Sequence, residues 1–288
     1  MERIELSEEQ LRKIKQVELN ILKIFDCVCR RLDIHYSLAS GTLLGAVRHQ
    51  GFIPWDDDID VMLLREDYDK LLKEGSKYLP SQYFLQTYET EPSYPMNFAK
   101  IRDVETVFVE CGVESLDMQH SIYIDIFPID TISEFSTMRH LENMKLALIN
   151  AIKFSCTREL SDRSSSRLRG AIRKCLYPVC KAIGTQRLNR NETRLRTRYT
   201  TQRTTMTFAD RYSMPPHRLT NQMAMPISYF QEYSTLNFEG QAFQVIAAYD
   251  SYLKSMYGDY MKLPPKEQQR PHHECVRIQF QDEEEGAI

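Results

Sequence analysis

Two aspartates separated by one residue, Asp58 and Asp60, are well placed in this sequence to bind a metal ion. The run from Asp58 to Met62 predicts a strand on which both carboxylates share one face while Ile59 and Val61 enter the core. Neighbouring carboxylates repel each other unless a cation or a proton lies between them. The pair therefore predicts a site for Mg²⁺ or Mn²⁺, and the alternative is an acidic surface turn.

A third carboxylate, Asp125, lies within an apolar run that predicts a strand over residues 122–127. A carboxylate among such residues is costly unless it is paired. We expect Asp125 to serve as a metal ligand or as the base that accepts a hydroxyl proton. Asp130 competes for this role, but it follows Pro128 and is predicted to lie in a turn.

Two features indicate a phosphate site. Ser40 and Gly41 stand between a predicted short strand and a predicted helix over residues 42–49, and glycine lets backbone approach a phosphate while the N–H groups of the helix start attract anions. Lys100 and Arg102 are two residues apart on a predicted strand, so both can face phosphate oxygens. The alternative for these two cations is a solvated edge strand.

The run GTLLGAVRHQGFIPWDDDIDV closely resembles the signature of the LicD family, bacterial phosphocholine transferases of the nucleotidyltransferase superfamily, related to the fukutin-related phospho-polyol transferases. Two further segments, residues 100–106 and 257–265, are similar to later motifs of that family. The resemblance implies an α+β fold, a nucleotidyltransferase-like small mixed β-sheet flanked by helices, with a basic helical insertion. It also implies transfer of a phospho-alcohol, with phosphocholine as the favoured cargo, from a CDP-alcohol to a hydroxyl of a glycan or its lipid-linked precursor.

The residues and the resemblance together predict one site. Its catalytic and metal-binding residues are Asp58, Asp60 and Asp125. Its donor-binding residues are Ser40, Gly41, Thr42, Arg48, Trp55, Lys100, Arg102, Glu239, Arg270 and His273. The aromatic candidates for holding a choline cation are Trp55, Tyr94 and Tyr123. Asp56 and Asp57 are candidates for binding that cation or a second metal, or are simply solvated.

Composition narrows the class of protein. The 288 residues are 42% hydrophobic and 27% charged, which is ordinary for a soluble globular protein. No apolar run approaches the roughly 18 to 20 residues of a membrane span. Seven cysteines without a C-x-x-C pair, and an N-terminus without an apolar signal segment, indicate free thiols and a cytoplasmic protein.

Helical spacing predicts a long amphipathic helix that follows a capping box at Ser7 and Gln10. A second helix is predicted over residues 136–156, with one apolar stripe formed by Met138, Leu141, Met144, Leu148 and Ile152. We predict a catalytic core over residues 1–135, a helical basic insertion over 136–235 and a C-terminal segment over 236–288 that returns to the core.

Residues 158–203 contain thirteen Lys or Arg against three acids, a local charge of +10 in a chain whose net charge is −3. This separation predicts an anionic partner. A basic amphipathic helix around residues 165–184, predicted to break at Pro178, suits the inner face of a membrane or a phosphate-bearing glycan. The alternative is a helical lid with solvated cations. Nucleic acid is disfavoured because no aromatic platform interleaves the arginines, and residues 191–207 are predicted to be a polar connection.

Two other functions compete with phospho-alcohol transfer. A glycosyltransferase could use the D-x-D pair on a metal with a nucleotide-sugar donor, but it would not need the Ser-Gly turn. A catalytically silent nucleotide-binding scaffold is disfavoured because all three carboxylates are present.

Overall fold

A mixed β-sheet forms the centre of the computed structural model, which describes residues 3–133, 135–157, 167–199, 206–208, 224–271 and 273–281. Within these ranges the sheet has seven strands, of which β2 and β6 are parallel neighbours and the other pairs are antiparallel. The main path runs β1 (Ser37–Leu38), β2 (Asp60–Leu64), β6 (Tyr123–Thr131), β4 (Ala99–Asp103) and β3 (Tyr83–Gln86). Strands β7 (Met206–Phe208) and β8 (Ala224–Pro226) extend it from β6.

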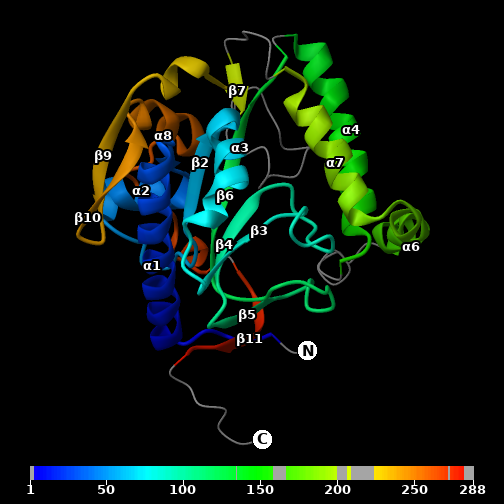
Figure 1. The fold of residues 1–288 in the computed structure, drawn as a ribbon, viewed down its shortest axis with the longest axis horizontal. Coiled ribbons are helices and arrows are strands. Elements are labelled where there is room, and N and C mark those ends of the chain that lie inside the picture. The colour runs from blue at the N-terminus through cyan, green and yellow to red at the C-terminus, as the bar shows by residue number, and fades with distance from the viewer. Residues whose placement is uncertain are drawn as a thin grey trace, which may run out of the picture.

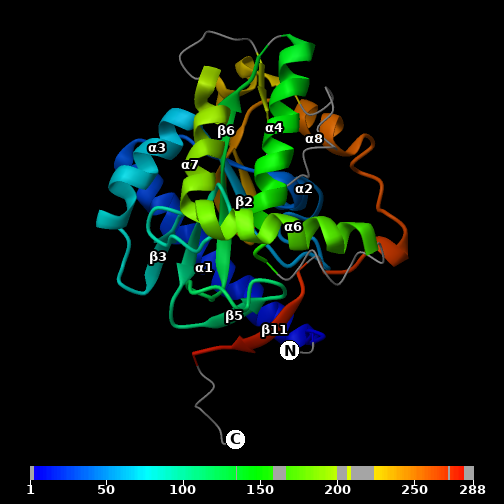
Figure 2. The same ribbon diagram turned by 90° about the vertical axis from the view of Figure 1, so that its right-hand side faces the viewer.

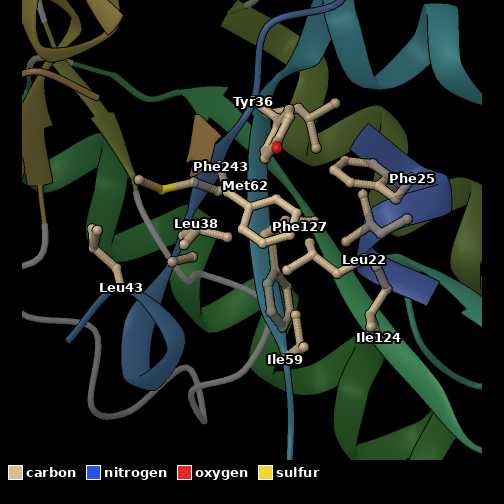
Figure 3. Close-up of a cluster of buried hydrophobic side chains, with 14 of the residues drawn as sticks. Leu22, Phe25, Tyr36, Leu38, Leu43, Ile59, Met62, Ile124, Phe127 and Phe243 are labelled. Atoms are coloured by element: carbon tan, nitrogen blue, oxygen red, sulfur yellow. The ribbon is translucent and has the colours of Figure 1, made fainter. Parts of the chain in front are cut away.

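The long helix α1 (Glu8–Leu32) packs against β4 and β6 (Figure 1). Its predicted capping box is confirmed, because the Ser7 side chain accepts from the Gln10 N–H and the Gln10 side chain accepts from the Ser7 N–H. Leu22 and Phe25 of this helix meet Ile124 and Phe127 of β6 in the core (Figure 3). Helix α3 (Arg65–Glu74) contacts β2 and β6. The sheet and α1 thus form the core that supports the predicted site.

A second group of elements packs around β1 and β2. Helix α2 (Ser40–His49) follows β1 directly and contacts β2, β9 and α8. Strands β9 (Tyr233–Phe238) and β10 (Gln241–Ile246) form a hairpin, and α8 (Tyr249–Tyr257) follows it. Short 3₁₀ turns complete the described chain at Gly75–Lys77, Thr197–Tyr199, Ile227–Phe230 and Lys266–Gln268.

Segments far apart in the sequence meet at one end of the molecule. Strand β5 (Val107–Glu110) pairs with β11 (Cys275–Gln279), and Ile4 forms a bridge with Cys275. Figure 1 shows β11 beside β5, below the start of α1. This pairing brings His273, just before β11, to the strand that carries Glu110.

Helices α4 (Ser136–Phe154), α6 (Arg167–Ile183) and α7 (Thr185–Arg196) contact one another and lie on the side of the molecule away from the β9–β10 hairpin (Figures 1 and 2). The predicted break at Pro178 is wrong, since α6 continues through it. A proline costs one helical hydrogen bond, and here Lys174 and Pro178 are both exposed, so water can satisfy the freed carbonyl. In the part of the chain that the structure describes, no helix is long and apolar enough to cross a membrane.

Three further predictions of elements need correction. Residues 191–199 are not a connection but belong to α7 and a 3₁₀ turn, while 200–205 lie outside the described residues. Strand β2 begins at Asp60, so Asp58 precedes it, although Ile59 is buried and its carbonyl accepts from the Asp125 N–H. Asp130 lies within β6 rather than in a turn.

Pro128 is tolerated inside β6 because of its neighbours. Strand β4 pairs with β6 only as far as Ile126, and β7 begins its pairing at Asp130. Among the described strands, only β2 lies beside Pro128. Proline has no N–H to donate, but β4 is not paired with β6 at this position, so no hydrogen bond between these two strands is lost.

Candidate active site

Asp60 and Asp125 lie directly opposite each other on the parallel strands β2 and β6. The backbone of Asp60 is held on both sides, since its N–H donates to Thr42 Oγ1 at 2.8 Å and its carbonyl accepts from the Ala39 N–H at 2.9 Å. Neighbouring strands are about 4.8 Å apart, so the two carboxylates start from adjacent backbone positions. The sheet therefore brings together two of the three predicted catalytic residues.

The loop before β2 places three carboxylates, Asp56, Asp57 and Asp58, with oxygens within 4.8 Å of one another. Asp56 is buried, and burial together with Asp58 and Asp57 raises its pKa to about 8. A Cβ on Gly41 would lie 2.5 Å from the Asp56 carboxylate. Glycine is therefore required at position 41 by the close approach of this carboxylate.

Glu18 of α1 is a buried member of this acidic group that our sequence analysis missed. Burial raises the pKa of its carboxyl well above the usual value, and Asp58, Asp57 and Asp56 add to the effect. Its Oε2 atom has no hydrogen-bond partner. A signal was present in the sequence, because Glu18 falls on the apolar face of α1 between Ile14 and Leu22.

His273 connects the C-terminal segment to the acidic loop. Its backbone N–H donates to Asp57 Oδ2 at 2.9 Å, and its Nδ1 lies 3.5 Å from Asp57 Oδ1. Burial opposes the charge of the imidazole, but Asp57, Asp58 and Glu110 outweigh it and raise its pKa to about 10. In the metal-free protein these carboxylates therefore favour the protonated form of the His273 imidazole.

Lys100 lies between the acidic groups and β5. Its Nζ is 3.2 Å from Asp125 Oδ1 and 3.5 Å from Glu110 Oε1, and it lies 3.2 Å from the ring centroid of Tyr123. Burial opposes the charge of Glu110, but Lys100 and Arg102 outweigh it and lower its pKa to about 2. Burial raises the pKa of Asp125 despite Lys100.

Arg102 is fully buried and its guanidinium is engaged by Gln86, the Ser121 carbonyl and Glu110. Strand β4 lies between β3 and β6, so Lys100 and Arg102 are not on a solvated edge strand. Of the two predicted phosphate-binding cations, Lys100 contacts a predicted catalytic carboxylate, Asp125, whereas Arg102 contacts Glu110.

Asp130 and Asp125 have separate roles. The Arg65 Nε and Nη2 atoms donate to the two Asp130 oxygens at 2.7 and 2.9 Å, and both residues are buried. Asp130 lies five residues further along β6 than Asp125 and pairs with the first residue of α3. This buried ion pair favours Asp125 as the third carboxylate.

The other predicted donor-binding residues have the following contacts. Ser40 has a φ of 43° and its N–H donates to the Tyr252 hydroxyl, while Arg48 donates to the Tyr260 carbonyl at 2.9 Å. Glu239 accepts from the Phe52 N–H at 3.0 Å and so supports the loop before the acidic run. Trp55 stacks edge-on with His49, and Arg270 is exposed.

A small pocket opens beside Lys100 and His273. These two cations and two carboxylates, Glu110 and Glu274, line its polar part, and Tyr94, Met96, Val113 and Met118 contribute its apolar walls. Lys100 covers the face of Tyr123, so of the three aromatic candidates for a choline cation it is Tyr94 that lines this pocket. The pocket joins groups that suit phosphate oxygens to groups that suit an alkyl cation.

The acidic residues fit a divalent cation. Carboxylate oxygens are the ligands that Mg²⁺ and Mn²⁺ prefer. Glu18 Oε2 lacks a hydrogen bond, and Asp125 Oδ1 has only an ion-pair contact with Lys100. Within the described residues, the carboxylates whose oxygens lie close enough together to hold one ion are Asp56, Asp57 and Asp58. This group shares only Asp58 with the predicted set of Asp58, Asp60 and Asp125.

Comparisons with known proteins agree on a family. Residues 33–155 match the family model described as LicD/FKTN/FKRP, nucleotidyltransferase domain. The chain is 31% identical over 278 residues to the lipopolysaccharide cholinephosphotransferase LicD of Haemophilus influenzae, covering 95% of this chain and 97% of that protein. An uncharacterised protein of Rickettsia prowazekii is 40% identical over 70 residues, which are 22% of this chain and 26% of that protein. A similar protein of Rickettsia typhi is 39% identical over 70 residues, 22% of this chain and 23% of its own length.

Proposed function

The chain belongs to the LicD family, and we propose that it transfers phosphocholine from CDP-choline to a hydroxyl group of a cell-surface glycan, such as lipopolysaccharide, or of its lipid-linked precursor. It is a LicD-like enzyme of the transferase class. The relative from Haemophilus influenzae, named for cholinephosphate transfer to lipopolysaccharide, matches along almost its entire length and supports this choice of cargo and acceptor.

One observation carries the proposal: Asp60 and Asp125 face each other in register beside the cluster of Asp56, Asp57 and Asp58. In the proposed enzyme Asp60 and the cluster would hold Mg²⁺ or Mn²⁺, which would supply positive charge to the diphosphate of the donor. Lys100 and His273 add two fixed cations at the edge of the same group. Such prearranged charges stabilise the negative charge that develops on the departing CMP.

We assign Asp125 as the base that accepts the proton of the attacking hydroxyl group. Its pKa is raised by burial, which makes the carboxylate a better proton acceptor near neutral pH. The ion pair with Lys100 holds this carboxylate in place. The second option is that Asp125 binds the metal ion, and the roles proposed for the other residues are then unchanged.

The proposal is tested with purified protein and Mg²⁺ in the presence of CDP-choline, CDP-ribitol, CDP-glycerol or a UDP-sugar. Release of CMP from CDP-choline, with phosphocholine appearing on an added lipopolysaccharide acceptor, is the expected result. Release of UDP instead would identify a nucleotide-sugar glycosyltransferase.

Paired variants distinguish catalysis from binding alone. Asp58→Asn and Asp60→Asn should each abolish CMP release. If no donor is turned over and both variants bind CDP-choline as the unmodified protein does, the chain is a nucleotide-binding scaffold and the proposal is wrong.

A further inference from the structure

Helix α4 presents an apolar stripe to solvent. Leu141, Met144 and Leu148 follow one another at helical spacing and are 51, 58 and 58% exposed. The opposite side of α4 buries Glu142, Leu146 and Lys153. Exposed apolar stripes of this kind mark surfaces that bind another protein or a membrane.

Helix α6, which contacts α4, is also exposed along most of its length. Ile172 and Val179 are exposed on it, and so are Lys174 and Lys181. Figure 2 shows α4 and α6 in the outer layer of the molecule. With 3.6 residues per turn, Lys174 and Lys181 lie on the side of α6 opposite Ile172 and Val179. Helix α6 is thus amphipathic, with its lysines on the polar side, as in helices that lie at a membrane interface. We call the exposed side chains Leu141, Met144 and Leu148 of α4 and Ile172, Lys174, Val179 and Lys181 of α6 together the basic apolar face.

The charge on these helices has one sign. Residues 136–154, 167–183 and 185–196 contain two acids, Glu142 and Glu192, and both are buried. Glu192 is bound by Lys153 and Arg196. The cations exposed on the described parts of the three helices include Lys145, Lys174, Lys181, Arg187 and Arg194. An occupant of this face therefore has to be anionic as well as apolar.

We propose that the basic apolar face docks on the surface of an anionic lipid bilayer. Aliphatic and methionine side chains enter the boundary between headgroups and acyl chains, while the lysines meet the lipid phosphates. A second copy of the chain fits less well, because a symmetric contact would bring each cationic face against another. The inference depends on α4 and α6 alone and does not require the proposed donor.

Vesicle binding tests the proposal. The full chain is sedimented with vesicles of phosphatidylcholine alone, or of phosphatidylcholine containing about one third phosphatidylglycerol. We expect binding to the anionic vesicles only, weakening as salt is added. Each Lys or Arg near such a surface contributes about 1 kcal/mol, so Lys174→Glu with Lys181→Glu should weaken binding roughly 30-fold or more.

Matched variants separate this face from general effects. Leu141→Gln, Met144→Gln and Leu148→Gln together should abolish binding and keep good helix formers in α4. Met261→Gln with Leu263→Gln alters two residues of similar exposure elsewhere, and Arg12→Glu with Lys73→Glu makes the same charge change on other helices. Both control pairs should bind as the unmodified chain does.

Three results would overturn the proposal: no binding to anionic vesicles, unchanged binding of both face variants, or equal losses in the controls. Light scattering that shows a dimer dissociated by the α4 variant, without vesicle binding, would assign the face to a second copy. Thermal unfolding checks each variant, and if the α4 variant does not fold, the lysine pair alone decides.

Discussion

The backbone of Asp60 is held at the site by Thr42 Oγ1 on its N–H and by the Ala39 N–H on its carbonyl. Both contacts use backbone atoms of Asp60 and not its carboxylate. The side chain can therefore be changed without removing the contacts that position the strand.

Asp60→Ala should reduce transfer by roughly 100-fold or more while the protein remains folded, because the loss removes charge that acts on the reacting phosphate. Removing one of several repelling carboxylates should slightly raise the melting temperature without metal. Asp117→Ala, at an exposed aspartate outside the site, is the control and should change neither quantity. Near-normal turnover in Asp60→Ala would falsify the assignment.

Gly41→Ala tests the contact with Asp56. A Cβ would lie 2.5 Å from Asp56 Oδ2, so the carboxylate has to move. A displacement of about 1 Å at a reacting centre costs roughly 100-fold in rate. We expect lower transfer and a smaller Mg²⁺-induced rise in melting temperature. In Gly75→Ala the new Cβ meets only the flexible end of Leu71, and this variant should behave as the unmodified enzyme does.

Strand β6 has two functions at its two ends. Asp125 faces the acidic loop at the start of the strand, and Asp130 pairs with Arg65 of α3 near its end. We propose a chemical role for the first position, whereas the second fixes α3 to the sheet.

Asp130→Ala should therefore lower the free energy of unfolding by about 3–5 kcal/mol, because it leaves the buried Arg65 without its main partner. The folded fraction should still transfer phosphocholine. Asp69→Ala removes the exposed partner of the same arginine and should cost about 1 kcal/mol or less. Chemical denaturation measures both values, and equal costs would contradict the assigned role of Asp130.

Elements with a regular apolar period were predictable, and elements with buried polar faces were not. The period of α1 and the capping box at Ser7 are explicit in the sequence. Helix α7 buries Asn189, Glu192 and Arg196 beside Leu188, so its inner face is mostly polar and its residues 191–196 read as part of a polar connection. The stripe on α4 was predicted correctly as helical, but periodicity alone does not say which side of a helix faces the core.

Prediction of the site from the sequence was limited in the same way, because part of the site is formed by contacts across the whole molecule. Local motifs led to Asp58, Asp60 and Asp125; Asp60 lies opposite Asp125 in the sheet, and Asp58 contributes to the raised pKa of Asp125. Glu18 and Glu110 reach the site through tertiary packing from α1 and β5. No spacing rule connects residues separated by so much of the chain.

The acidic group makes the stability of the metal-free protein depend on pH. The pKa of Asp56 is raised from 3.8 to about 8, so its neutral form favours the folded state. This contribution is complete below about pH 3.8 and is lost as the pH rises through 8. The melting temperature in EDTA should therefore fall between pH 5 and pH 8.5, and Asp56→Asn should reduce the fall.

Mg²⁺ should reverse this effect. The ion binds ionised carboxylates, so the rise in melting temperature that it causes should be larger at pH 8.5 than at pH 5.5. Calorimetry at both values measures the difference. A metal effect that does not depend on pH, or is unchanged in Asp56→Asn, would contradict the role of this carboxylate.

The pairing of β11 with β5 has a consequence for synthesis on the ribosome. Glu110 is translated early, whereas His273 and its strand emerge some 165 residues later. A nascent chain that ends before Gln279 lacks part of β11, the strand that follows His273 and holds it beside Asp57. Its proposed reaction centre is therefore incomplete. We therefore expect the proposed site to form only after β11 has been translated, and chains that stop before it should not turn over the proposed donor.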